Sequence, residues 1–153
     1  MIIIKSCSPF LGVDNPLSGQ LAPDFTLKMT NGQAINMTQY RAGQPAMIFF
    51  WATWCPHCRK QLSELSLNRQ AIEANGIKII LVDIGEDSQK VNAYIDANNI
   101  LFDIFLDEST EIANAYEISG VPTFIFISRE GIIIDVKNIL PDDYQKILLD
   151  GAS

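Results

Sequence analysis

Residues 46–58 read AMIFFWATWCPHC, and this stretch decides the fold. An uninterrupted apolar run bounded by Pro45 is typical of a strand buried on both faces of a sheet. The helix expected over 56–74 begins inside the Cys-x-x-Cys motif, so Cys55 and Cys58 lie across its first turn. Unpaired N–H groups and the helix dipole at that point favour the thiolate of Cys55. The motif therefore predicts a redox dithiol in which Cys55 is the nucleophile and Cys58 resolves the mixed disulfide.

The other expected elements follow from hydrophobic periodicity and turn signals. Alternating residues on either side of Asn31-Gly32 predict a tight hairpin. Further along, strands alternate with helices, which implies a parallel sheet with right-handed crossovers. Ser88 is the expected N-cap of one helix, and Pro141 is expected in the first turn of the last. The expected strands are 25–28, 33–36, 46–51, 77–84, 101–106, 123–128 and 132–137, and the expected helices are 56–74, 88–98, 109–116 and 141–149.

Several motifs, in this order, make the chain resemble the thioredoxin superfamily from about residue 21 to residue 149. They are Ala22-Pro23-Asp24-Phe25, the Asn31-Gly32 hairpin, Phe50-Trp51-Ala52-Thr53-Trp54-Cys55, an inserted stretch over 82–105, and Val121-Pro122-Thr123. Within that superfamily the chain is most similar to the TlpA/ResA branch. The resemblance implies an α/β thioredoxin-like fold, in which helices flank a central mixed sheet. It also implies an N-terminal hairpin and a βα insertion before a cis-proline.

The resemblance also implies roles for residues around the dithiol. In this superfamily the proline corresponding to Pro122 is cis and lies against the cysteines, and the backbone of the preceding residue, here Val121, pairs with an extended substrate segment. Trp54 completes the expected partner-binding surface. His57 is the one histidine of the chain. An imidazole beside the Cys55 sulfur would stabilise its thiolate and make the disulfide more oxidising, whereas the alternative is a solvated helix residue without such a role.

Pro56-His57 is the same dipeptide that the oxidase DsbA carries between its cysteines, so Pro56 and His57 are both candidate tuning residues. Three positions depart from the family pattern. The TlpA/ResA branch often has a glutamate where this chain has Gln61 and a proline where it has Ser63, and the thioredoxins proper have a buried aspartate where it has Phe49. A glutamine accepts no proton, so the proton that leaves Cys58 during resolution must go elsewhere, to water or through His57.

These observations predict a thiol-disulfide oxidoreductase that exchanges disulfides with protein cysteines and needs an upstream redox partner. A TlpA/ResA-like reductase is expected, with cytochrome c maturation among the roles that the resemblance implies. The alternatives are a DsbA-like oxidase or isomerase, a peroxiredoxin-related protein and a non-catalytic binding protein. A peroxiredoxin would have a Pro-x-x-x-Thr-x-x-Cys setting, whereas here Trp54 directly precedes Cys55. No cofactor is expected, and no metal site, because soft ligands are too few for zinc.

Composition limits the range of partners and the domain organisation. The chain has 153 residues and a formal net charge of −7, and its 11 Lys and Arg form no run, which excludes a nucleic-acid partner. We expect a flexible leader over 1–20 and a single monomeric thioredoxin-like domain over 21–153. The expected location is extracytoplasmic, in the periplasm or on the outer face of a membrane. Ser6-Cys7 would suit a lipoprotein cleavage site, and the protein would then have a membrane tether outside this sequence. The alternative is that Cys7 is an incidental cysteine of the leader.

Overall fold

The computed structural model describes residues 17–150, with Asp150 described by its backbone alone. A five-stranded sheet in the order β5-β4-β3-β6-β7 forms its centre. β3 pairs in parallel with β4, and β4 with β5, whereas β6 runs antiparallel to both β3 and β7. The expected mixed sheet is confirmed. Its strands are β3 (Ala46–Trp51), β4 (Lys78–Ile84), β5 (Ile104–Asp107), β6 (Thr123–Ile127) and β7 (Ile133–Lys137).

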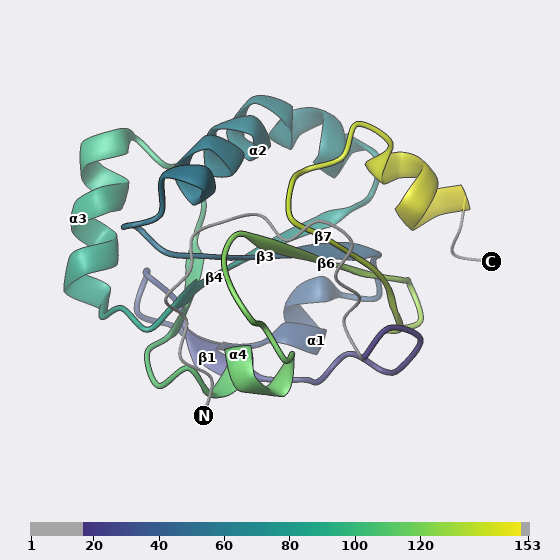
Figure 1. The fold of residues 1–153 in the computed structure, drawn as a ribbon, viewed down its shortest axis with the longest axis horizontal. Helices are drawn as coiled ribbons and strands as arrows, with labels where there is room; N and C mark the ends of the chain where they lie inside the picture. The colour runs from purple at the N-terminus through teal and green to yellow at the C-terminus, as the bar shows by residue number, and fades with distance from the viewer. Residues whose placement is uncertain (1–16, 151–153) are drawn as a thin grey trace.

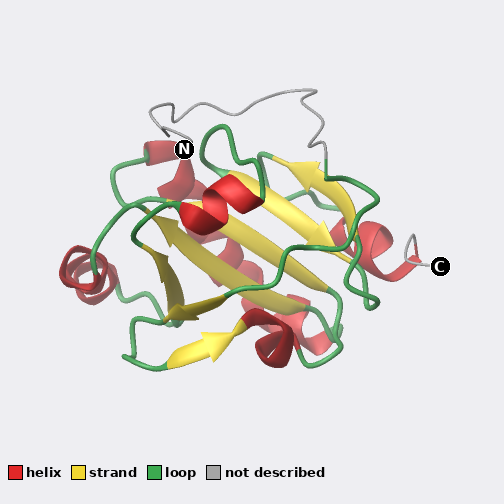
Figure 2. Ribbon diagram, turned by 90° about the horizontal axis from the view of Figure 1, so that it is seen from below, coloured by secondary structure: helices red, strands yellow, loops and turns green. Residues whose placement is uncertain are grey.

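Helices cover both faces of this sheet (Figure 1). The long helix α2 (Pro56–Ala74) lies across one face, with α3 (Ser88–Asn98) beside it and the C-terminal π-helix η1 (Lys146–Asp150) further along. The short helices α1 (Met37–Arg41) and α4 (Glu111–Ala115) lie on the opposite face, which Figure 2 shows from below. This three-layer arrangement follows from βαβ crossovers, since each helix packs back onto the sheet that its strands form.

β3 and α2 have the bounds that the sequence predicts, because their signals are local. All six residues of β3 are buried, as a continuous apolar run in a central strand requires. α2 begins at a proline in its first turn and ends where Asn75 and Gly76 interrupt it, Gly76 having a φ of 77°. The strand therefore delivers the Cys-x-x-Cys motif directly onto the start of a helix.

The N-terminal hairpin forms as expected, but its loop is longer than a two-residue turn. β1 (Thr26–Lys28) and β2 (Ala34–Asn36) pair antiparallel in a separate two-stranded sheet. Met29, in the loop, makes an isolated bridge to Phe105 at the edge of β5. The hairpin thus attaches to the edge of the main sheet through its loop.

Several boundaries differ from those expected. The sequence did not predict α1, a five-residue helix that Asn36 caps by accepting a hydrogen bond from the Gln39 N–H at 3.0 Å. Asp87, not Ser88, is the N-cap of α3. The closing helix starts at Tyr144, so the expectation of Pro141 in its first turn was wrong. The other strand and helix ends differ by up to three residues.

Most of the expected leader lies outside the described residues, as does Cys7. Its last residues, 17–20, form a turn that pairs with the start of β7. The Gly19 N–H donates to the Ile133 carbonyl at 2.8 Å, and the Ile133 N–H donates to the Gln20 carbonyl at 2.9 Å. Among the described helices none is both long enough and apolar enough to cross a bilayer.

Candidate active site

The first cysteine of the motif occupies the N-cap position of α2. Cys55 has an extended backbone, with φ −97° and ψ 110°, and Pro56 follows at the first helical position. The Cys58 N–H donates to the Cys55 sulfur at 3.2 Å, which brings the two cysteines together. Sulfur here takes the place of the oxygen that usually caps a helix. This position, at the positive end of the helix dipole, favours a negative charge on the Cys55 sulfur.

The loop before β6 lies against this sulfur. The Val121–Pro122 peptide bond is cis, as the family resemblance implies. The Val121 carbonyl oxygen lies 3.9 Å from the Cys55 sulfur. The Asn138 side chain donates to the Pro122 carbonyl at 3.2 Å, and the Thr123 hydroxyl donates to the Gly120 carbonyl at 2.7 Å. Residues far apart in the sequence therefore meet at the dithiol.

The predicted surface residues differ in exposure. Trp54 is 42% exposed, whereas Val121 and Pro122 are buried. Pro56 and His57 are exposed on the first turn of α2, and the His57 side chain makes no hydrogen bond or ion pair within the described part of the chain. The roles of these five residues in tuning and partner binding remain predictions.

The second cysteine is enclosed. Cys58 is fully buried and carries a free thiol, so it is not joined to Cys55 in this structure. Burial raises the pKa of Cys58 to about 12, and the nearby charges of Asp83 and Glu86 act in the same direction. Cys55 is fully buried as well, so the two cysteines differ in their place on α2: the Cys55 sulfur caps the helix, and Cys58 lies within its first turn.

Two of the positions that depart from the family pattern, Gln61 and Phe49, are structural. Gln61 is buried, and its side-chain oxygen accepts a hydrogen bond from the Leu140 N–H at 2.7 Å. It ties the segment before the C-terminal helix to α2. Phe49 stacks between Trp51 and Phe124 in the core beneath α2. Neither side chain can exchange a proton with Cys58.

Sequence reasoning missed a pair of acids near the second cysteine. Asp83 lies near the end of β4, and Glu86 follows in the loop before α3. Both are buried, and both contribute to the electrostatic field at Cys58. The signal was an aspartate inside the otherwise apolar run 79–84, because a charged residue rarely occupies a central strand without a partner. No group of three or more His, Cys, Asp or Glu side chains able to hold a metal ion occurs among residues 17–150.

Comparisons with known proteins agree with this geometry. The AhpC/TSA family model matches residues 18–136. The chain is 29% identical to thiol-disulfide oxidoreductase ResA of Bacillus subtilis over 127 residues, covering 83% of this chain and 70% of ResA. It is 30% identical to sporulation thiol-disulfide oxidoreductase A of the same organism over 116 residues, covering 74% and 69%.

The fold is also that of a solved structure from the same group of proteins. The crystal structure of StoA from Bacillus subtilis superposes with a TM-score of 0.69 at 27% identity, covering 82% of this chain and 96% of StoA. The family model matches most of the chain. The cis-proline and the mixed sheet of the structure are consistent with that match. The chain therefore belongs to the AhpC/TSA family of thioredoxin-like proteins, among its TlpA/ResA-like members.

Proposed function

We propose that this protein is a thiol-disulfide oxidoreductase that exchanges disulfides with cysteines of other proteins and acts as a ResA-like reductase. The observation that carries the proposal is the position of Cys55 as N-cap of α2, with the Cys58 N–H 3.2 Å from its sulfur. Two sulfurs one helical turn apart can close a disulfide with little movement of the backbone. The names of the relatives, ResA and sporulation thiol-disulfide oxidoreductase A, support the same activity.

The unequal environments of the two cysteines define the order of events. The positive end of α2 favours the Cys55 thiolate, so this sulfur attacks the disulfide of a partner protein first. Cys58 stays a thiol while it is buried, because burial raises its pKa to about 12. Once Cys55 is linked to the partner, the Cys58 sulfur attacks it, releases the reduced partner and closes the Cys55–Cys58 disulfide.

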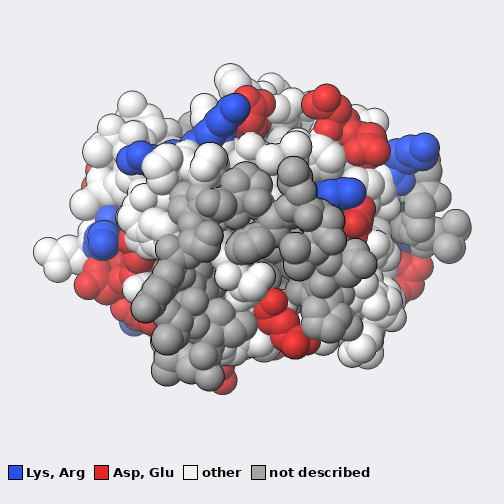
Figure 3. Space-filling model, in the orientation of Figure 1, with Lys and Arg blue, Asp and Glu red and all other residues white. Residues whose placement is uncertain are grey.

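Partner binding and location complete the proposal. Trp54, Val121 and Pro122 form the partner site: Trp54 supplies its exposed apolar area, and Val121, whose side chain is buried like Pro122, pairs through its backbone. Figure 3 shows Lys and Arg scattered among Asp and Glu on one face of the molecule, with no basic patch among the described residues there. A nucleic-acid partner is therefore not part of the proposal. The protein works outside the cytoplasm as a monomer, with an upstream thiol donor and a role in cytochrome c maturation.

The equilibrium with glutathione tests the activity and its direction. The protein is incubated in glutathione buffers of defined potential, and its free thiols are counted by mass after acid quenching. A ResA-like reductase should have a midpoint near about −270 mV, the value typical of thioredoxin. A midpoint near about −120 mV would instead support the oxidase that the Pro56-His57 dipeptide suggests. A dithiol that does not equilibrate with glutathione would contradict both.

A further inference from the structure

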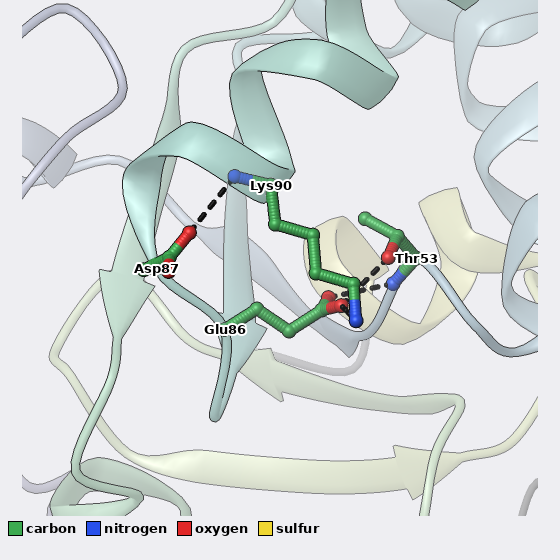
Figure 4. A network of polar contacts seen from close by, with 4 residues as sticks. All are labelled: Thr53, Glu86, Asp87 and Lys90. Carbon is green, nitrogen blue, oxygen red and sulfur yellow. Dashed lines mark hydrogen bonds and ion pairs between the residues drawn. The ribbon is translucent and has the colours of Figure 1, made fainter.

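The turn that leads into Cys55 is held by a carboxylate from the neighbouring loop. β3 and β4 are parallel neighbours, so the segments that follow them, 52–55 and 85–87, leave the same edge of the sheet. Glu86 accepts one hydrogen bond from the Thr53 N–H at 2.8 Å and another from the Thr53 hydroxyl at 2.6 Å. Figure 4 shows the Glu86 carboxylate pointing at both donors. Each of its two oxygens therefore binds a different group of Thr53.

This contact is buried and charged. Glu86 and Thr53 are both buried, and the Lys90 ammonium, which is mostly exposed, lies 3.4 Å from the same carboxylate. Although burial opposes it, the hydrogen bonds that Glu86 accepts and the Lys90 charge hold the pKa of Glu86 below its usual value. Glu86 is therefore an anion at neutral pH. Hydrogen bonds to an ionised acceptor are roughly twice as strong as those between neutral groups, so the contact fixes Thr53 firmly.

Trp54 depends on this contact for its position. It follows Thr53 directly, and its side chain is 42% exposed. Among residues 17–150 that side chain makes no hydrogen bond or ring contact that would hold it. The direction in which Trp54 points is therefore set by the backbone of the turn, and Glu86 fixes that backbone at Thr53.

The reactive sulfur has contacts of its own. The Cys55 N–H donates to the Ala52 carbonyl at 3.2 Å, and the Cys55 sulfur accepts from the Cys58 N–H at 3.2 Å. Neither bond involves Thr53 or Glu86. The chemistry at Cys55 and the placement of Trp54 thus have separate supports. An aromatic side chain held in place before binding contributes more to affinity, because less freedom is lost when the partner arrives.

We propose that Glu86 is a positioning residue for partner binding, which fixes Thr53 and thereby presents Trp54 to the partner protein beside Cys55. The inference rests on the proposed function, in which Trp54 belongs to the partner site, and adds Glu86 and Thr53 to it. No bond is made or broken at Glu86, which stays a carboxylate throughout the exchange.

The test compares a protein disulfide with a small one. Cys7→Ser is the background, so that Cys55 and Cys58 are the remaining cysteines. The reduced protein is mixed with excess insulin or with excess 2-hydroxyethyl disulfide, and formation of the Cys55–Cys58 disulfide is followed by mass after acid quenching. The readout is the ratio of the two rate constants, insulin over 2-hydroxyethyl disulfide, because a change in thiol reactivity affects both reagents equally. Glu86→Ala should lower this ratio by about tenfold, the effect of one hydrogen bond to a charged group.

Exchanges at Thr53 probe the same contact without changing any charge. Thr53→Val has the shape of threonine but lacks the hydroxyl, whereas Thr53→Ser keeps it. Thr53→Val should lower the ratio by about threefold to tenfold, and Thr53→Ser should have the ratio of the background protein. An equal fall in both variants would trace the effect to the lost methyl group and overturn the role of the hydrogen bond.

A matched control separates positioning from a general loss of structure. Asp107 is also a buried acid, and its oxygens accept hydrogen bonds from the Ile112 and Ala113 N–H groups at 3.1 Å and 2.9 Å. Asp107→Ala therefore also leaves two buried donors without their acceptor, but away from Thr53. It should lower the free energy of unfolding and leave the ratio unchanged. An equal fall of the ratio in Asp107→Ala and Glu86→Ala would overturn the proposal.

Backbone amide relaxation measures the position of Trp54 directly. The order parameter of the Trp54 amide should be near about 0.85 in the background protein, the value of a rigid backbone, and below about 0.6 in Glu86→Ala. The same order parameter in both proteins would overturn the proposal without any assay of activity.

Trp54→Ala tests the route by which Glu86 acts. This variant should itself lower the ratio, and adding Glu86→Ala to it should lower the ratio little further, because both changes remove the same interaction. Fully additive losses would overturn a role through Trp54.

The outcomes distinguish failure of this inference from failure of the proposed function. If the background protein reacts with neither disulfide, or with 2-hydroxyethyl disulfide alone, the proposed exchange with protein cysteines is wrong. If it reacts with both and Glu86→Ala has the same ratio, the positioning role of Glu86 alone is wrong.

Discussion

His57 is the residue whose exchange tests the electrostatic tuning of Cys55. It is exposed on the first turn of α2, next to the sulfur that caps the helix. We predict that an imidazole there stabilises the thiolate and therefore the reduced protein. His57→Pro should lower the midpoint potential by tens of millivolts, since about 30 mV corresponds to 1.4 kcal/mol for a two-electron couple. The glutathione equilibrium measures the shift.

The control for His57 is an exposed lysine of the same helix. Lys60→Met removes a charge further from Cys55 and should change the potential less than His57→Pro. A His57→Pro protein with the potential of the unchanged chain would contradict a tuning role and leave His57 as a solvated helix residue.

For single residues, the sequence predicts the roles of those that belong to a local motif. It misses the roles of those that depend on contacts distant in the sequence. Cys55 and Cys58 follow from their spacing, and Pro122 from the family resemblance. Asp83 was missed because its burial depends on contacts among three strands and two helices. The same contacts leave its carboxyl oxygens without a hydrogen-bond partner among the described residues. The structural role of Gln61 was missed for the same reason, because its partner Leu140 lies far along the chain.

At the start of α3 the N-cap in the structure is Asp87, one residue before the Ser88 expected from the sequence. The Asp87 carboxylate accepts a hydrogen bond from the Lys90 N–H at 2.9 Å, whereas Ser88 is already the first helical residue. Asp87→Ala should lower the free energy of unfolding by about 1 kcal/mol, the usual value of an N-cap. Ser88→Ala should have little effect. Urea unfolding of both variants makes the comparison, and a larger loss in Ser88→Ala would show that the cap lies one residue later.

Elements with strong local signals were predicted with correct bounds, and short or tertiary-dependent ones were not. β3 and α2 combine an apolar run, a proline and a terminal Asn-Gly, and these signals act within a few residues. α1 has five residues, too few to form a stable helix alone, and depends on Asn36 and on packing against the sheet. The C-terminal helix begins later than expected, and the segment before it is held to α2 by the hydrogen bond from the Leu140 N–H to Gln61, a contact distant in the sequence.

For the whole molecule, the buried proton of Asp83 predicts how stability depends on pH. Its folded-state pKa of about 10 is raised above its unfolded value, so the folded protein binds one more proton between the two values. The stability that this proton gives is present at low pH and is lost as pH rises toward the folded pKa. The free energy of unfolding of Asp83→Asn, minus that of the unchanged chain, should therefore increase with pH by up to about 1.4 kcal/mol per unit.

Denaturant unfolding at several pH values between the two pKa values measures this difference. Shifted groups that Asp83 does not influence, including Tyr40 and Tyr94, are present in both proteins and largely cancel, whereas the pKa values of Cys58 and Glu86 depend in part on Asp83 and change with it. A difference that stays constant or falls with rising pH would show that Asp83 is ionised in the folded protein.

The proposed reaction depends most directly on the order in which the two sulfurs react. In a Cys7→Ser background, Cys58→Ser and Cys55→Ser are each mixed with a disulfide-bonded protein, and products are separated without reductant. We predict that Cys58→Ser accumulates a mixed disulfide at Cys55, because no second sulfur is available to resolve it. Cys55→Ser should accumulate none, since burial raises the pKa of Cys58 to about 12 and keeps its thiol protonated. A mixed disulfide at Cys58, or none in either variant, would contradict it.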